Sequence, residues 1–114
     1  MTETGQNFTM WSGDTKVLEV TITDGDGAAV NLTGATISYV LQRNVNSAAA
    51  TISKTTDDGI SITDASGGVF QITLDASDTA SLSGSYYHEC QITDTSGNVS
   101  TVFTGTVTME VDAI

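Results

Sequence analysis

The most reactive side chains in the sequence are His88 and Cys90, its only histidine and its only cysteine. They are two residues apart, so on an extended strand both would lie on one face. A zinc site needs about four ligands, and this pair has no CxxC motif and no second histidine beside it. A cysteine nucleophile needs an exposed thiolate and a base oriented by a third group, and no motif supplies them. We therefore expect both to be core residues, with no catalytic residue, metal site, cofactor or intramolecular disulfide.

Aspartates are the second candidates for chemistry, because carboxylates bind calcium. The turn Asp24-Gly25-Asp26-Gly27 begins like a calcium loop, but an EF-hand has a glutamate at the twelfth position, which here is Ala35. Asp75 and Asp78 also suit the start of a short helix, which needs no ion. The other interpretation is that Asp75 and Asp78 bind a calcium ion together with an aspartate from a turn. This requires the loops to meet at one end of the fold, and the candidate turn residues are Asp24, Asp26 and Asp64.

The charge of the chain excludes two classes of partner. Fourteen acidic residues stand against Lys16, Arg43 and Lys54, which gives a net charge of −11. Phosphate backbones and anionic lipid surfaces bind clustered lysine and arginine, which three dispersed cations cannot supply. We therefore expect no nucleic acid and no membrane among the partners. The first residues have neither the basic region nor the apolar run of a signal peptide, so we expect synthesis in a cytoplasm.

Alternating apolar and polar residues predict an all-β fold. The chain has 114 residues, of which 39% are hydrophobic and 15% charged, which is typical of one strand-rich domain. We expect an N-terminal arm with a possible edge strand at 1–12 and a single domain at 13–114. The predicted strands lie at 16–23, 35–41, 51–55, 60–62, 69–74, 86–92 and 99–111.

Two residues within these strands carry further predictions. Lys54 is the kind of charge that protects an exposed sheet edge, so 51–55 is predicted to be an edge strand. Gly105 falls on the apolar side of the last strand, where a β-bulge or a close approach of another backbone is the usual reason for a glycine.

The segment between the strands at 69–74 and 86–92 predicts a corner rather than a continued ladder. It is rich in Asp, Ser and Thr, which suits a short capped turn of helix, and Gly84 ends it. Tyr86 is placed to fold its ring into the core and return its hydroxyl to the corner backbone, as a tyrosine corner does. The residues expected to build this corner are Asp75, Asp78, Leu82, Gly84 and Tyr86.

Four residues are candidates for an interface. Phe8, Met10 and Trp11 form a short apolar group that could dock on another subunit. Trp11 either covers the end of its own core or anchors an interface, where tryptophan is enriched. Tyr87 is the one tyrosine whose position in the alternation points away from the core.

The spacing of Leu74, Asp75, Asp78, Thr79, Leu82, Gly84 and Tyr86 resembles the corner of immunoglobulin-like domains in bacteriophage virion proteins. The chain is most similar to the N-terminal domain of phage baseplate upper proteins. The triplet Gly13-Asp14-Thr15 and the run from Asp26 to Ile37, which reads D-G-x-x-V-x-L-T-G-A-x-hydrophobic, support the resemblance. It implies an immunoglobulin-like β-sandwich of seven or eight antiparallel strands with a tyrosine-corner-like turn.

The resemblance also implies a function. We expect a non-enzymatic structural protein of a phage particle, either a docking module of the tail or baseplate or a decoration of the capsid surface. Its partners would be other virion proteins, with a possible homo-oligomer, and its place would be the virion. The alternative is a small carbohydrate- or calcium-binding adhesion module.

Overall fold

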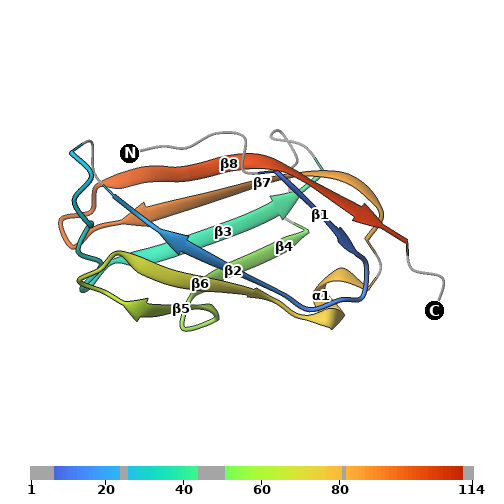
Figure 1. The fold of residues 1–114 in the computed structure, drawn as a ribbon, viewed down its shortest axis with the longest axis horizontal. Helices are drawn as coiled ribbons and strands as arrows, with labels where there is room; N and C mark the ends of the chain where they lie inside the picture. Colours follow the sequence, from blue (N-terminus) through green and yellow to red (C-terminus); the bar gives the residue numbers. More distant parts are fainter. Residues whose placement is uncertain (1–6, 24–25, 44–50, 81, 112–114) are drawn as a thin grey trace.

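A computed structural model describes residues 7–23, 26–43, 51–80 and 82–111 of the chain. These residues form eight strands and one short helix, so the predicted all-β class is confirmed (Figure 1). The elements are β1 (Phe8–Trp11), β2 (Lys16–Thr21), β3 (Thr36–Gln42), β4 (Ile52–Thr56), β5 (Gly59–Asp64), β6 (Val69–Leu74), α1 (Ala76–Thr79), β7 (Gly84–Thr93) and β8 (Val99–Glu110).

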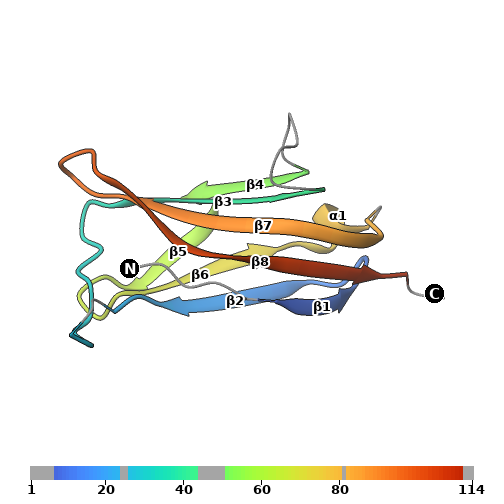
Figure 2. The same cartoon turned by 90° about the horizontal axis from the view of Figure 1, so that it is seen from above.

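The strands form one mixed sheet in the order β1-β8-β7-β3-β4-β5-β6-β2. Figure 2 shows the sheet folding back on itself, with β3, β4 and β7 in one layer and β2 and β6 in the other. The expectation of purely antiparallel strands is wrong at two places, since β1 runs parallel to β8 and β4 runs parallel to β5. Alternation along a strand shows which side is buried but carries no information about the direction of its neighbour.

β1 and β2 follow each other along the chain but do not pair with each other. β1 pairs with β8, whereas β2 pairs with β6 in the other layer. The turn between them is held by Thr79 of α1, whose hydroxyl accepts the N–H of Gly13 at 2.9 Å and lies 3.1 Å from the carbonyl oxygen of Asp14. Gly13 has a φ of 84°, which favours glycine. β1 and β2 therefore extend from one anchored turn, and they are the first and last strands in the order of the sheet.

β4 is an inner strand and not the predicted edge. It pairs with β3 on one side and, through Thr55 and Thr56 alone, with the start of β5 on the other. Lys54 therefore has a different role from edge protection: its Nζ lies 2.8 Å from a carboxylate oxygen of Asp78 in α1. The edge prediction failed because a short polar strand looks the same whether one or two neighbours pair with it.

The core lies between the two layers and is closed most tightly on the side of β3 and β6. The inward residues of β6, Phe70, Ile72 and Leu74, are completely buried. Burying side chains of this size contributes about 1.5 to 3 kcal/mol each. The inward residues of β3 are equally inaccessible and face them: Ile37, Tyr39 and Leu41.

The β-bulge of the last strand lies at Val102 rather than at Gly105. Cys90 pairs with Phe103 but Gln91 pairs with Thr101, so Val102 is the extra residue. Val102 and Phe103 are both buried, and the alternation changes phase there, which leaves Val99 59% exposed. Gly105 sits opposite His88 in regular register, so of the two reasons predicted for this glycine the bulge does not apply.

Candidate binding seam

A groove separates β2 from the first part of β8, and we call it the seam. It has a volume of about 420 Å³. Its walls come from β2, from the start of β1, and from the parts of β7 and β8 that face the core. The residues that line it are Asn7, Phe8, Lys16 to Thr23, His88, Val102 and Phe103.

Two strand edges border the seam. β2 pairs with β6, and β1 covers β8 only over Val107–Glu110. Within the described part of the chain, no strand pairs with the side of β2 away from β6, or, ahead of Val107, with the side of β8 away from β7 (Figure 1). At the border with β1, the N–H of Thr106 donates to Oδ1 of Asn7 at 2.7 Å. Strand edges carry backbone N–H and C=O groups that can pair with an added strand.

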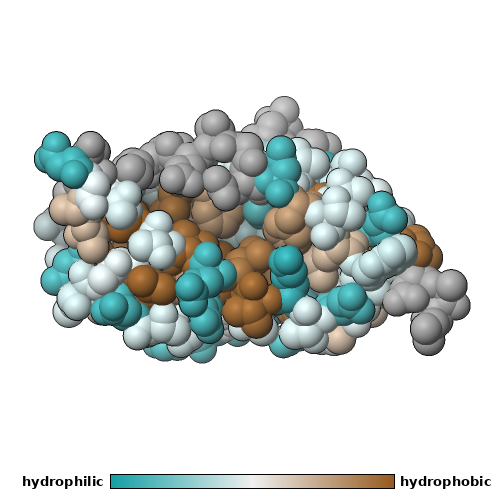
Figure 3. All heavy atoms as spheres, in the orientation of Figure 1, coloured by the Kyte–Doolittle hydropathy of each residue, from teal (hydrophilic) through white to brown (hydrophobic). Residues whose placement is uncertain are grey.

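The inner surface of the seam is apolar. Leu18 and Val20 point inward from β2 but are only partly buried, and Phe8 packs partly buried against the same core. Figure 3 shows apolar side chains gathered in the middle of this face. A hydrophobic core therefore reaches the surface between two strand edges.

An aromatic cluster forms the bottom of the seam around His88. The ring centroid of His88 lies 5.6 Å from that of Phe8 and 5.1 Å from that of Phe103. The hydroxyl of Tyr39 lies 3.0 Å from Nδ1 of His88. Burial, and next the nearby Cys90, raise the pKa of Tyr39, so its hydroxyl keeps its proton. A hydrogen bond donated by the Tyr39 hydroxyl to Nδ1 requires the His88 tautomer with its ring proton on Nε2.

Cys90 lies beside this cluster without access to solvent. Burial, and to a smaller extent the charge of Glu89, raise the pKa of its thiol to about 12. Because the thiolate is the nucleophilic and metal-binding form, this side chain is chemically inert at neutral pH. The seam therefore offers surface for binding rather than a group for covalent chemistry.

The mouth of the seam carries one charge of each sign. Nζ of Lys16 lies 5.1 Å from the ring centroid of Phe8, a cation–π contact. Glu19, on the outward side of β2, accepts a hydrogen bond from Nε2 of Gln71 at 3.3 Å. The rest of the seam is uncharged.

The four predicted interface residues lie in four different places. Phe8 lines the seam, while Met10 is a buried core residue. Trp11 is 50% exposed at the end of β1, opposite Glu110 of β8. Tyr87 points outward from β7, on the other side of that layer from the seam.

The start of the predicted corner is held by an ion pair. A carboxylate oxygen of Asp78 accepts the N–H of Asp75 at 2.8 Å and also contacts Lys54. Partial desolvation raises the pKa of the Asp78 carboxyl, but the contacts with Lys54 and the Asp75 backbone outweigh it, so the net pKa is lowered. Asp78 therefore joins α1 to β4.

The end of the corner packs onto the core. Gly84 has a φ of 88°, and Leu82 packs partly buried against the hydrophobic cluster. The ring of Tyr86 is buried, and its hydroxyl accepts the N–H of Ser83 at 3.3 Å. The guanidinium carbon of Arg43 lies 4.3 Å from the centroid of the same ring.

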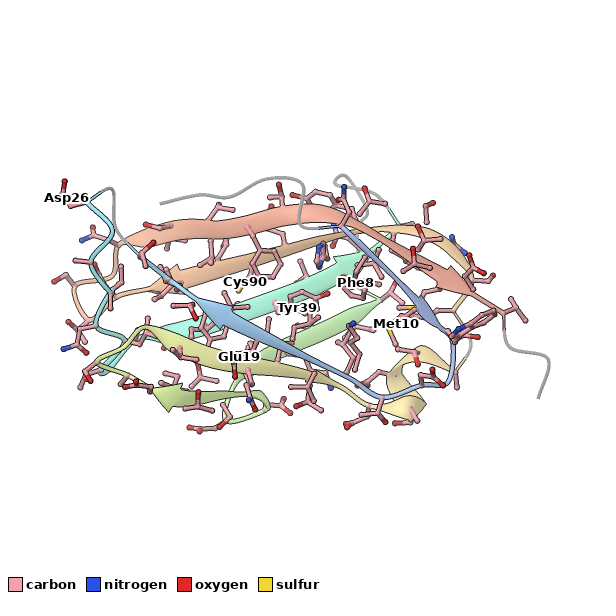
Figure 4. The ribbon with its side chains drawn as sticks, viewed as in Figure 1. Phe8, Met10, Glu19, Asp26, Tyr39 and Cys90 are labelled. Carbon is pink, nitrogen blue, oxygen red and sulfur yellow. The ribbon has the colours of Figure 1, made fainter. Side chains whose placement is uncertain are left out.

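The calcium alternative is not supported by the positions of the aspartates. Asp64 pairs with Val69 at one end of β6, whereas Asp75 follows Leu74 at the other end. Asp26 also lies at the end of the molecule away from α1 (Figure 4). Asp24 lies outside the described residues. Within the described ranges, no group of three His, Cys, Asp or Glu side chains could hold a metal ion, and no helix is long and apolar enough to span a membrane.

Sequence reasoning did not identify the seam. Leu18, Val20 and Phe103 look like ordinary core residues, because alternation predicts that a side chain points inward but not that a neighbouring strand covers it. The single indication was Phe8, which stood out as an apolar residue in a short first strand.

No protein family and no curated protein matches the chain. Among solved structures, it is similar to AggA, the major subunit of aggregative adherence fimbriae type I from Escherichia coli. The alignment has 18% sequence identity, covers 93% of this chain and 89% of the other, and gives a TM-score of 0.32. A likeness of this size carries no argument about function.

The expected role in a bacteriophage particle is corrected at this point. None of the comparisons supplies a virion protein: no family and no curated protein matches, and the similar structure is a bacterial fimbrial subunit. The baseplate, tail and capsid roles, with virion proteins as partners, are therefore not carried forward. The resemblance to baseplate upper proteins stays a prediction from the sequence.

Proposed function

We propose that this chain is a non-enzymatic assembly module that binds an extended segment of a partner protein in the seam. The observation that carries the proposal is the pair of strand edges, on β2 and on β8 ahead of Val107, on either side of an apolar groove. A strand added there would gain main-chain hydrogen bonds from the edges and bury alternate side chains on the apolar surface.

An immunoglobulin-like β-sandwich is the architecture that we propose for the module. The strand order divides into β1-β8-β7-β3-β4 and β5-β6-β2, and only two residue pairs join β4 to β5. The corner at Tyr86 supports the same assignment, because its hydroxyl returns to the backbone a few residues upstream. Two sheets packed face to face leave edges at their sides, and the seam is one such side.

The chemistry of the seam defines the partner segment. The apolar surface formed by Leu18, Val20 and Phe103 favours a partner segment in extended conformation with an apolar side chain at every second position. The net charge of −11 favours a segment that is neutral or positively charged, and it disfavours a second copy of this chain. The partner that we propose is therefore a cationic or neutral strand from a different protein.

Synthetic peptides test the proposal directly. A ten-residue peptide that alternates valine and threonine, with lysine at each end, should bind the full chain saturably in a calorimetric titration. Amide NMR shifts should concentrate on β2 and on β8 ahead of Val107. A peptide with glutamate at each end should bind more weakly, and the difference should shrink as salt is raised.

Two apolar residues, one inside the seam and one outside it, provide matched variants. Leu18→Gln places an amide in the seam and should weaken peptide binding about tenfold or more, which is 1.4 kcal/mol. Val111→Gln changes a residue that does not line the seam and is 69% exposed, and should leave binding unchanged. Absence of binding to the folded protein, or equal effects of the two variants, would overturn the proposal.

A further inference from the structure

The middle of the outward side of β8, β7 and β3, from the row of Ser38, Gln91 and Thr101 to the row of Gln42, Tyr87 and Thr106, is a second surface, separate from the seam, and we call it the outer face. Val99 and Glu110 lie on the same side near the two ends of β8, beyond these rows. Cross-strand pairs align its side chains in rows, with Gln42 and Thr106 on either side of Tyr87, and Val40 and Thr104 on either side of Glu89. It forms the outer side of the layer that contains β3 and β7 in Figure 2. The two surfaces share strands but lie on opposite sides of them.

The outer face is polar but almost uncharged. In a chain with a net charge of −11, Glu89 is the one charged residue among these outward positions. The others carry hydroxyl or amide groups, apart from Val40. The outward positions are Ser38, Val40, Gln42, Tyr87, Glu89, Gln91, Thr101, Thr104 and Thr106.

Hydrogen bonds fix the side chains at the centre of this face. The hydroxyl of Tyr87 donates to Oε1 of Glu89 at 2.6 Å, and Nε2 of Gln91 donates to Oε2 at 3.1 Å. All three side chains are partly buried although they point outward. Desolvation, and next the hydrogen bond to Glu89, raise the pKa of Tyr87 to about 12, so the donor persists across the physiological range. Side chains that are already ordered lose little conformational entropy when a ligand binds.

This combination does not suit a protein partner of ordinary composition. The centre of a protein interface is apolar and aromatic, whereas here Val40 is the only aliphatic side chain and Tyr87 the only ring. It does suit a ligand with one C–H face and many hydroxyls. An aromatic ring packs against the C–H face, and carboxylate, amide and hydroxyl groups exchange hydrogen bonds with the rim.

We propose that the outer face binds a neutral oligosaccharide. Tyr87 packs against the C–H face of one sugar ring. Glu89 accepts hydrogen bonds from sugar hydroxyls through its remaining lone pairs, while Gln91 and Gln42 donate and accept at its sides. The charge of the protein opposes sulfated or carboxylated glycans, which makes the neutral class the expected ligand.

The probes for this site are four neutral hexasaccharides: maltohexaose, cellohexaose, chitohexaose and mannohexaose. At least one should bind the full chain in an NMR titration, with shifts centred on Tyr87, Glu89 and Gln91. Tyr87→Ala should weaken that binding at least tenfold, while Trp11→Ala, at an exposed ring outside the outer face, should leave it unchanged. Both variants should unfold at the temperature of the parent within a few degrees.

Three outcomes of these titrations would overturn the proposal. These outcomes are a folded protein that binds none of the four, binding that survives Tyr87→Ala, or tighter binding of a sulfated hexasaccharide. Loss of sugar binding in Leu18→Gln would move the site to the seam. Because the peptide titration probes the seam alone, either proposal can fail without the other.

Discussion

β6 and β2 are neighbouring strands with similar alternating sequences, but their inward side chains are buried to different extents. Leu18 pairs with Ile72 and Val20 pairs with Phe70, and all four point into the core. Ile72 and Phe70 are completely buried, whereas Leu18 and Val20 are only partly buried. The difference comes from what lies beyond each strand: β6 has β5 on its far side, and β2 has the seam.

This difference shows that the hydrophobic core is closed on one side only. Burial of apolar surface stabilises a fold by about 25 cal/mol for each Å², and surface left in contact with water does not contribute this stabilisation. Contiguous apolar surface on a folded protein commonly marks an interaction site. The seam is therefore the part of the core whose burial depends on another molecule.

The largest expected effect compares the two members of one cross-strand pair. Ile72→Ala should lower the free energy of unfolding by about 3 to 4 kcal/mol, because it leaves a cavity in the closed part of the core. Leu18→Ala should cost about 1 to 2 kcal/mol, because water already reaches that side chain. Urea denaturation of both variants measures the difference, and equal losses would contradict the contrast between the strands.

A smaller effect is expected at the bottom of the seam. Tyr39→Phe removes the hydrogen bond to Nδ1 of His88 in a buried site, and should lower the free energy of unfolding by about 1 to 2 kcal/mol. Tyr87→Phe on the outer face serves as the control. It should lower the free energy of unfolding by less than about 1 kcal/mol, because water can take the place of the Tyr87 hydroxyl as the hydrogen-bond donor to Glu89. A larger loss for Tyr87→Phe than for Tyr39→Phe would show that the bottom of the seam is not rigidly packed.

The smallest effect concerns the ion pair that fastens the closed side. Lys54→Met should lower the free energy of unfolding by about 0.5 to 1 kcal/mol at neutral pH. The lowered pKa of Asp78 means that this stabilisation is present above its unfolded pKa of 3.8 and is lost as pH falls through the lower folded value. Between about pH 5 and pH 2, Asp78→Asn should therefore lose less stability than the parent. An unchanged acid profile would contradict this role.

The sequence allowed most of the strands to be located. The alternation of Phe70, Ile72 and Leu74 predicted β6 with its observed bounds, and the strands around it were found within a few residues. The strength of this signal has a physical cause, since a residue on the wrong side of a half-buried strand would expose an apolar side chain or bury a polar one.

Strand neighbours could not be predicted in the same way. The parallel pairing of β1 with β8, the inner position of β4 and the bulge at Val102 all depend on contacts between distant segments. The seam belongs to this group, because Leu18 would look the same with or without a strand beside it. The composition did limit its chemistry, because the one cysteine and the one histidine of the sequence are both buried.

The parallel pairing of β1 and β8 has a mechanical consequence. Phe8 pairs with Val107 and Trp11 with Glu110, so chain entering β1 and chain leaving β8 depart from opposite ends of the same ladder. Tension between those two directions pulls the strands along each other and loads all of their hydrogen bonds together, in shear. A pair loaded this way resists force better than one that opens bond by bond, so the end of the fold next to the seam is also suited to carry a pulling load.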